Sequence, residues 1–332
     1  SRQHGIRLLK RLNANFTYRL VVTLLSLISP SAQALETDQF YAWGKPNEDS
    51  THYLNAWVRL QIQDVLDTRV NGVPRDCGNA VEFIQKRLQH SIYQPIELWI
   101  NSTDLVDRVP RGIEEYQDYR ESYLLSKTVP LDTARGLQPS PTLEVNGIRI
   151  GSDKLAHFFS EGWWYYSWWK KHRDDMSEDE LQQKLLRYGV KLEWWVQGKL
   201  LTGVISPADM EANYQGFIFY RQLCSGNEPL LSRQDGHWQF STDFDISAYI
   251  SPEWDESWNA NIYSKLRWKN IRKTMAGYCP MLNSTWVEQQ RTHYAELDKQ
   301  TPTDEFIKNL VAEGELPDPG FFDITSVCEG LP

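Results

Sequence analysis

The sequence lacks any hydrophobic run long enough to cross a membrane. The apolar stretch LVVTLLSLIS, residues 20–29, is ten residues long, whereas a transmembrane helix needs roughly 18 or more consecutive apolar residues. A basic segment without acidic residues precedes it, and Ala32-Gln33-Ala34, a small-x-small cleavage pattern, follows it. We therefore expect residues 1–34 to be a signal peptide. Residues 35–332 would then form a periplasmic or secreted protein without a transmembrane segment.

Positive charge is also scarce. The chain has 35 Lys and Arg against 44 Asp and Glu, which gives a formal net charge of -9, and removing the five basic residues of the leader changes this to -14. Binding to a nucleic-acid backbone depends on basic surface, so a nucleic-acid partner is excluded. A solvated acidic surface explains the excess most simply, and a cation or a cationic partner is the alternative.

Cysteine is limited to four residues, and none of them forms a CxxC pair or lies near a histidine at zinc-ligand spacing. An even number in an exported chain predicts two disulfides, although isolated buried thiols are the alternative. The three possible connectivities remain open, with a slight preference for a bond that ties the tail near Cys328 back to the body. The chain also has no GxSxG motif and no glycine-rich nucleotide loop.

Helical periodicity dominates residues 35–332, and we predict a mainly α, bundle-like single domain with one short β-hairpin near 142–150. The hairpin signal is TLEVNGIRI, because Asn146-Gly147 suits a type I′ turn. Residues 94–100 are predicted as a short strand, residues 236–249 as one or two strands, and the proline-rich residues 129–141 as a loop or soft internal boundary. The predicted helices cover residues 51–68, 78–90, 113–126, 152–171, 177–196, 206–224, 261–275, 284–297 and 303–313. Ser177 and Ser206 are the expected N-caps of the helices over 177–196 and 206–224.

The helix that begins after the hairpin reads GSDKLAHFFSEGWWYYSWWKK and is aromatic on most sides. Asp153, His157 and Glu161 recur every four residues and form one slanted polar row, beside Trp164 and Trp168. A helix that is apolar all round is normally buried. We therefore expect the three polar side chains to share a confined site inside the protein.

Three interpretations of this row remain open. Carboxylate and imidazole groups bind zinc and other divalent metals, which makes Asp153, His157 and Glu161 candidate metal ligands. The same groups perform acid–base catalysis, with His157 and Glu161 as catalytic residues. A purely structural role is the third interpretation: Ser152 caps the helix, the helix dipole favours Asp153, His157 pairs with Glu161, and Lys154 neutralises an acid locally.

A second segment, SPADMEANYQGFIFYRQLC at residues 206–224, supplies further candidates. We expect Glu211, as a possible catalytic acid, and Asn213, as a ligand-binding residue, to meet the first helix, and we interpret Asp209 as an acid of the cap region. Trp254 in WDESWN joins Trp164 and Trp168 as a candidate ligand-binding residue. A capped turn with packed indoles is the alternative for that segment.

The segment Asp153-Lys154-x-x-His157-Phe158 resembles the D-K-x-x-H-F element found in some small bacterial envelope proteins at the start of an apolar helix. This resemblance implies a role in the cell envelope. Two hypotheses follow. The chain is a hydrolase that acts on an envelope polymer or lipid through the Asp/His/Glu site, or it is a non-catalytic protein that binds a glycan or lipid surface through exposed tryptophans.

Overall fold

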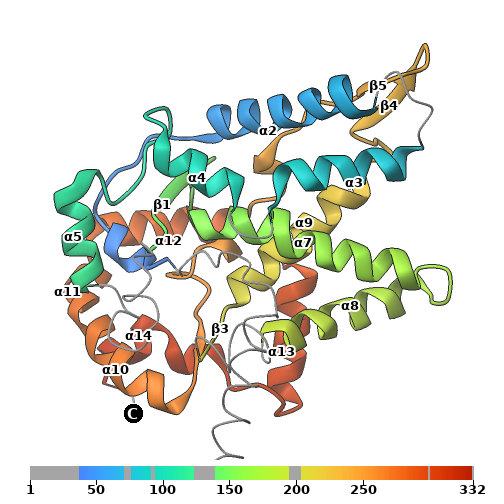
Figure 1. Ribbon diagram of the computed structural model, residues 1–332. Coiled ribbons are helices and arrows are strands. Elements are labelled where there is room, and N and C mark those ends of the chain that lie inside the picture. Colours follow the sequence, from blue (N-terminus) through green and yellow to red (C-terminus); the bar gives the residue numbers. More distant parts are fainter. Residues whose placement is uncertain are drawn as a thin grey trace, which may run out of the picture.

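Helices make up most of the protein, which confirms the predicted fold class (Figure 1). The computed structural model describes residues 37–70, 76–90, 94–122, 139–193, 203–297 and 300–330. The predicted signal peptide, residues 1–34, and most of the predicted boundary at 129–141 lie outside the described residues.

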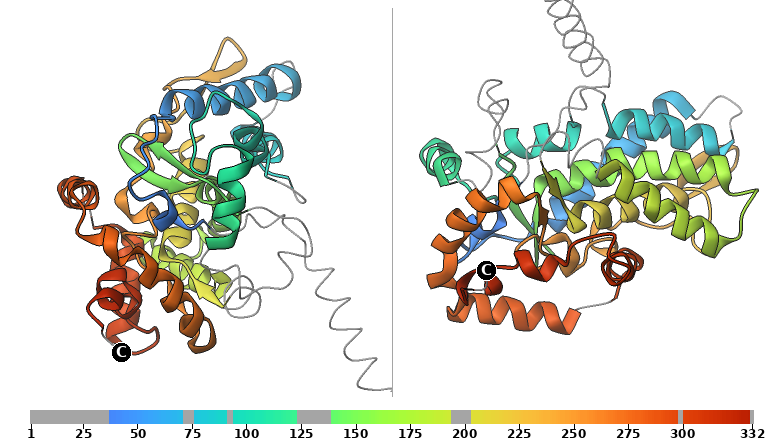
Figure 2. Two further views of the ribbon diagram at one scale, coloured as in Figure 1. Left: turned by 90° about the vertical axis from the view of Figure 1, so that its left-hand side faces the viewer. Right: turned by 90° about the horizontal axis from the view of Figure 1, so that it is seen from below.

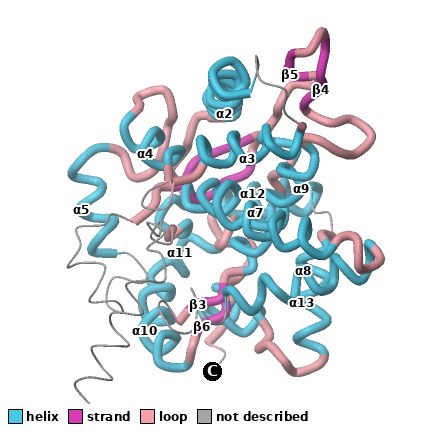
Figure 3. Tube along the Cα trace, turned by 45° about the vertical axis from the view of Figure 1, so that its right-hand side comes forward, coloured by secondary structure: helices cyan, strands magenta, loops and turns pink. Residues whose placement is uncertain are grey.

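Within these described ranges the chain forms a series of helices interrupted by three small antiparallel strand pairs, which lie apart from one another (Figure 3). The helices are α2 (Thr51–Val65), α3 (Cys77–Leu88), α4 (Pro95–Ser102), α5 (Gly112–Ser122), α7 (Ser152–His172), α8 (Glu178–Leu192), α9 (Pro207–Gln222), α10 (Lys265–Met275), α11 (Cys279–Leu282), α12 (Thr285–Leu297), α13 (Pro302–Ala312) and α14 (Ile324–Cys328). The strand pairs are β1 (Thr142–Val145) with β2 (Ile148–Gly151), β3 (Val204–Ile205) with β6 (Ile262–Tyr263), and β4 (Leu231–Gln234) with β5 (His237–Phe240).

Local sequence signals account for the elements around the site. Asn146 and Gly147 have φ values of 51° and 76°, the positive angles of the expected hairpin turn between β1 and β2. The side chains of Ser177 and Ser206 accept hydrogen bonds from the backbone at the starts of α8 and α9, as the sequence predicted. The cap of α7 differs from the prediction, because Gly151 is the N-cap and Ser152 is the first helical residue.

The predicted strand over residues 94–100 is wrong, because this segment is part of helix α4. Pro95 occupies the first turn, where its missing N–H costs nothing. Ile96 and Ile100 are buried, whereas Leu98 between them is exposed. In a strand all three side chains would share one face, so this burial pattern is that of a helix.

Helix α7 crosses the middle of the molecule, with α3 on one side and α8 on the other (Figure 1). Its main partner is α9, and it also packs against α4. The helices α10, α11, α13 and α14 lie on the side of α7 opposite to α2 (Figure 2). Most α7 side chains are buried, including Asp153, Lys154 and Glu161, so the predicted burial of this helix is confirmed.

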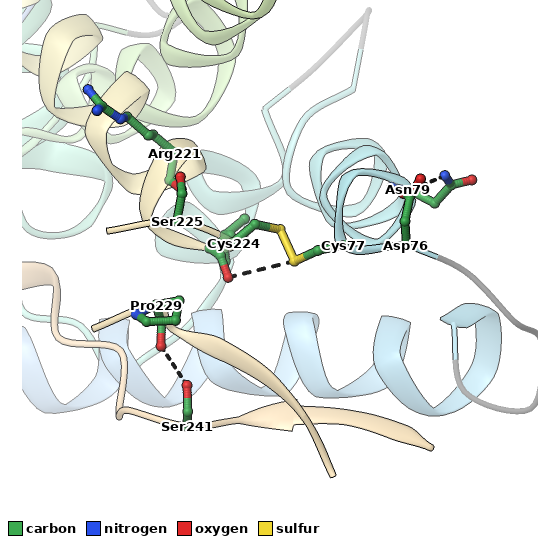
Figure 4. The surroundings of a disulfide bond; sticks show 9 residues. Asp76, Cys77, Asn79, Arg221, Cys224, Ser225, Pro229 and Ser241 are labelled. Atoms are coloured by element: carbon green, nitrogen blue, oxygen red, sulfur yellow. Dashed lines mark hydrogen bonds between the residues drawn. A yellow bond between two sulfur atoms is a disulfide. The ribbon is translucent and has the colours of Figure 1, made fainter. Parts of the chain in front are cut away.

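All four cysteines are paired, which confirms the expectation of two disulfides. Cys77 at the start of α3 bonds to Cys224 just after α9 (Figure 4), and Cys279 bonds to Cys328. The second bond ties the C-terminal tail to the body, as preferred from the sequence. None of the helices in the described ranges combines the length and the hydrophobicity that crossing a bilayer requires.

Candidate functional site

A fully buried lysine lies at the centre of the polar site. The Lys154 ammonium is 2.7 Å from Asp153 Oδ2 and 2.6 Å from Asp209 Oδ1. It is also 2.5 Å from Glu256 Oε1, which comes from the loop that follows the short turn Pro252–Trp254. The lysine side chain has no solvent exposure, and contacts with three carboxyl groups compensate for the loss of its hydration. The structure thus shows Lys154 neutralising Asp153, as the structural interpretation expected, and also joining three separate segments.

The imidazole of His157 lies one turn further along α7. Its Nε2 atom is 3.4 Å from Asp209 Oδ2, and its Nδ1 atom is 3.2 Å from Asn213 Oδ1 and 3.7 Å from Glu161 Oε2. Burial lowers the pKa of His157, but the carboxylates of Asp209, Glu161 and Glu193 outweigh this effect and raise it to about 10. The predicted meeting of Asn213 with the α7 row is therefore present.

Asp209 connects the two cationic side chains. One of its oxygens contacts the Lys154 ammonium and the other faces His157. Burial raises the pKa of Asp209, whereas His157 and Lys154 lower it, and the net result is a pKa below its ordinary value. The sequence placed Asp209 in the cap region, and its backbone N–H does donate to Ser206 Oγ at 3.1 Å. Its second role as a bridging carboxylate was missed.

Glu193 follows the last turn of α8 and was also missed in the sequence. The residue is 2 % exposed, and among the described residues its Oε1 atom has no hydrogen-bond partner. Donor atoms of His157, Glu193 and Asp209 all lie within 4.8 Å of one another, a spacing that permits metal binding. Burial, followed by the negative charge of Asp209, raises the pKa of Glu193 to about 8.

A second set of donor atoms adjoins the first and shares Asp209 with it. The carboxylates of Asp153, Asp209 and Glu256 lie within 4.8 Å of one another, and the Lys154 ammonium contacts all three. Burial raises the pKa of Glu256 to about 7. From the sequence, the surrounding WDESWN segment was expected either to bind a ligand through Trp254 or to form a capped turn. The turn is present, because Asp255 Oδ1 accepts from Ser257 N and Oγ at 2.8 and 2.6 Å, but Glu256 was not singled out.

One further acid lies near the buried cluster formed by Asp153, Lys154, His157, Glu161, Glu193, Asp209 and Glu256. Glu97 on α4 accepts a hydrogen bond of 3.0 Å from Ser140 Oγ. Burial, followed by the negative charge of Asp153, raises the pKa of Glu97 to about 7. The site therefore collects acids from α4, α7, α9, the end of α8 and the segment after Trp254. Each of these segments therefore supplies only part of the site.

The predicted metal set of Asp153, His157 and Glu161 needs correction. Among the described residues, His157 groups with Glu193 and Asp209, while Asp153 groups with Asp209 and the ammonium-bound Glu256. Glu161 lies on the Nδ1 side of the imidazole, at 3.7 Å, and belongs to neither set. Residues four apart on a helix share a face, but they do not point at one common position.

Glu211 does not meet the α7 row as expected. Its Oε1 atom accepts from Gln215 at 2.8 Å, and with Thr301 and Thr303 at the start of α13 it lines a separate cavity of about 460 Å³. Asp209 and Asn213 face α7, and Glu211 lies between them in the sequence. It therefore points to the other side of α9, because successive helical residues turn by about 100°.

The expectation of exposed tryptophans is wrong for Trp254. This side chain has no solvent exposure and packs in the core against Phe158, with ring centroids 6.0 Å apart. Trp164 and Trp168 are half-buried, and Trp168 stacks on Tyr188 at a centroid distance of 6.0 Å. The three indoles therefore do not form one exposed binding surface.

Comparison with known proteins gives no match: no family model matches the chain, and no curated protein or solved structure is significantly similar to it. The resemblance of the D-K-x-x-H-F segment to envelope proteins therefore stays a prediction. Functional inference rests on the geometry of the cluster.

Proposed function

We propose that this protein is an exported hydrolase that acts on an envelope polymer or lipid, with the His157 cluster as its active site. The single observation that carries the proposal is the difference in exposure within the cluster. The His157 side chain is 13 % exposed, whereas Asp209 and Glu161 beside it are 2 % and 8 % exposed. A solvent-reachable imidazole backed by buried acids suits a group that holds a reacting water or substrate in place.

Asn213 and Glu161 have different roles in this proposal: Asn213 positions the imidazole, and Glu161 transfers the proton. Asn213 Oδ1 accepts from the Nδ1–H group of His157, which fixes the ring and directs Nε2 towards Asp209. Glu161 is our candidate base, because its carboxylate lies beside the imidazole and outside the ion-paired set around Lys154. In the reaction, a water oxygen bonds to the electrophilic atom of the substrate and its proton passes to Glu161. The bond from this atom to the leaving oxygen then breaks, and the leaving oxygen takes the proton back from Glu161.

Export is supported by two features. Disulfides form and persist mainly in oxidising compartments, and this chain has two. The leader-like segment of residues 1–34 points the same way. The alternative function, non-catalytic binding of a glycan or lipid surface, is weakened by the burial of Trp254.

The proposal is tested with the purified chain on a panel of chromogenic carboxyl esters, phosphoesters and glycosides, together with cell-wall polymer. We expect turnover of one class and a loss of at least about 100-fold in kcat/KM for His157→Asn. Glu211→Gln is the matched control, because it changes a buried acid of α9 outside the cluster. Turnover that survives His157→Asn, or no turnover on any class by the unmodified protein, would overturn the proposal.

A further inference from the structure

We infer that the cluster binds one divalent cation through His157 Nε2, Glu193 and Asp209 Oδ2, while the Lys154 ammonium fills the adjoining cation position. This inference deepens the proposed function and rests on it only for the use of the ion. The binding itself is argued from the geometry of the side chains.

The separation of the first two donor atoms fits a shared metal better than a direct contact. His157 Nε2 and Asp209 Oδ2 are 3.4 Å apart, whereas charge-assisted N–H···O hydrogen bonds are usually about 2.7–2.9 Å. Two ligands bound at about 2.1 Å to one tetrahedral ion stand roughly 3.4 Å apart. The two atoms are therefore already at the separation of neighbouring zinc ligands.

Glu193 gives an independent indication of a missing partner. The residue is 2 % exposed, and its Oε1 atom has no hydrogen bond to any of the described residues. A buried carboxylate oxygen without a partner is costly, so such groups normally have a ligand or a hydrogen-bond donor. Because Glu193 has a donor atom within 4.8 Å of both His157 and Asp209, an ion between the three would supply that partner.

The far side of the imidazole has the arrangement expected of a metal-bound histidine. A ligating histidine usually donates its other ring N–H to an amide oxygen or carboxylate, which fixes the ring and its tautomer. Nδ1 of His157 has Asn213 Oδ1 at 3.2 Å and Glu161 Oε2 at 3.7 Å. Asn213 is therefore a positioning residue, and the ion binds Nε2 by displacing the proton that this nitrogen carries in the ion-free protein.

The second set of donor atoms limits the number of ions to one. Asp153, Asp209 and Glu256 are spaced for a cation, but the Lys154 ammonium lies 2.5–2.7 Å from all three. Asp209 therefore bridges two cation positions, of which the protein fills one with its own side chain. One imidazole and two carboxylates suit zinc or manganese, and three protein ligands leave a coordination position for water or substrate.

The test uses the purified, untagged chain, stripped with a chelator and then titrated with zinc or manganese chloride. We expect one ion per chain by elemental analysis after gel filtration, and a melting temperature that rises with ion concentration, because an ion that binds only the native state stabilises it. Both readouts are independent of turnover.

Two variants and a control locate the ion. Glu193→Gln keeps the shape of the side chain but replaces an ion ligand by an amide, so the stripped variant should melt no lower than the stripped parent while binding at least 10-fold more weakly. Asn213→Ala keeps all three ligands and should weaken binding by about 10–100-fold. Glu211→Gln should bind like the parent protein, because Glu211 lies on the opposite side of α9.

The inference is overturned if the stripped protein takes up no ion, or if Glu193→Gln binds as tightly as the parent, since the ion would then lie elsewhere. Its failure and that of the proposed function are distinguishable. One bound ion that depends on Glu193, without turnover of any substrate class, supports the inference and contradicts the hydrolase. Turnover by a protein that takes up no ion does the opposite.

Discussion

Gly162 of α7 and Gly216 of α9 face each other where the two helices pack together. A Cβ atom added to Gly162 would lie 2.6 Å from the Cα of Gly216, and one added to Gly216 would lie 3.0 Å from the Cα of Gly162. Real Cβ atoms do not approach other atoms this closely, so only glycine fits at either position. The contact lets the two backbones approach, which places His157 within reach of Asp209 and Asn213.

Gly216→Ala should therefore separate the helices. We expect a loss of about 3 kcal/mol or more in the free energy of unfolding, because the added methyl group meets helix backbone, which cannot move aside as a flexible side chain can. Gly277→Ala is the control, since a Cβ there has no neighbour within 4 Å. Urea unfolding of both variants measures the difference, and equal stabilities would show that the close approach is not required.

Lys154→Met should lower the stability of the protein, because it removes the positive charge that Asp153, Asp209 and Glu256 share. Removing one partner of a buried ion pair typically costs about 3–5 kcal/mol, and here three carboxylates lose a shared cation. We expect this loss in chelator, and partial recovery in zinc or manganese as a second ion occupies the ammonium position. Thermal unfolding with and without metal, together with elemental analysis, checks both effects. A variant that stays at one ion per chain would contradict the idea that Lys154 stands in for a metal.

The stability of the ion-free protein should fall as the pH rises from about 5 to about 8. Burial raises the pKa values of Glu97 and Glu256 to about 7 and of Glu193 to about 8, while the unfolded chain keeps ordinary values near 4.5. Within this window the folded state holds more protons than the unfolded state, so each rise in pH favours unfolding.

The variant Glu97→Gln isolates one of these contributions. It should remove part of the pH dependence, on the order of 1–3 kcal/mol between pH 5 and 8, because an amide does not titrate. Urea unfolding at the two pH values, compared between parent and variant, gives the size of the effect. Identical slopes would mean that Glu97 ionises normally in the folded protein.

The two disulfides should differ in their contribution to stability. Cys77 and Cys224 are 147 residues apart, whereas Cys279 and Cys328 are 49 apart, and a crosslink that closes a longer loop restricts the unfolded chain more. Replacing the first pair by serine should cost about 2–5 kcal/mol, and replacing the second pair about 1 kcal/mol less. Calorimetry of the two double variants decides the order, and the reverse order would show that native-state effects dominate.

Much of the fold was predictable because its signals are local. The turn at Asn146-Gly147 and the serine caps of α8 and α9 depend on a few neighbouring residues, and each was identified correctly. Helix α4 was missed because a segment of seven residues with several apolar side chains fits a strand as well as a helix. The available signal for the helix was Pro95, which suits a first helical turn, because the four-residue spacing of Ile96 and Ile100 fits both structures.

The candidate site was predictable only on its central helix. The burial of the α7 row followed from periodicity and is present. Asn213 was expected to meet this helix, and it does so at His157. Glu193 and Glu256 were missed because tertiary packing alone brings them to His157 and Lys154. The spacing of Asp209 and Asn213 did contain a usable signal, since residues four apart on α9 face the same way.

The bond between Cys77 and Cys224 closes a covalent ring that contains His157, Glu193 and Asp209. A ribosome synthesises the chain from its N-terminus, so this ring cannot close until residue 224 has been added and an oxidant is at hand. Glu256, which lies beyond the ring, can join Lys154 only after further synthesis. The complete cluster therefore cannot form before residue 256 has been synthesised, and reduction of this one disulfide removes a crosslink that spans all three of these side chains.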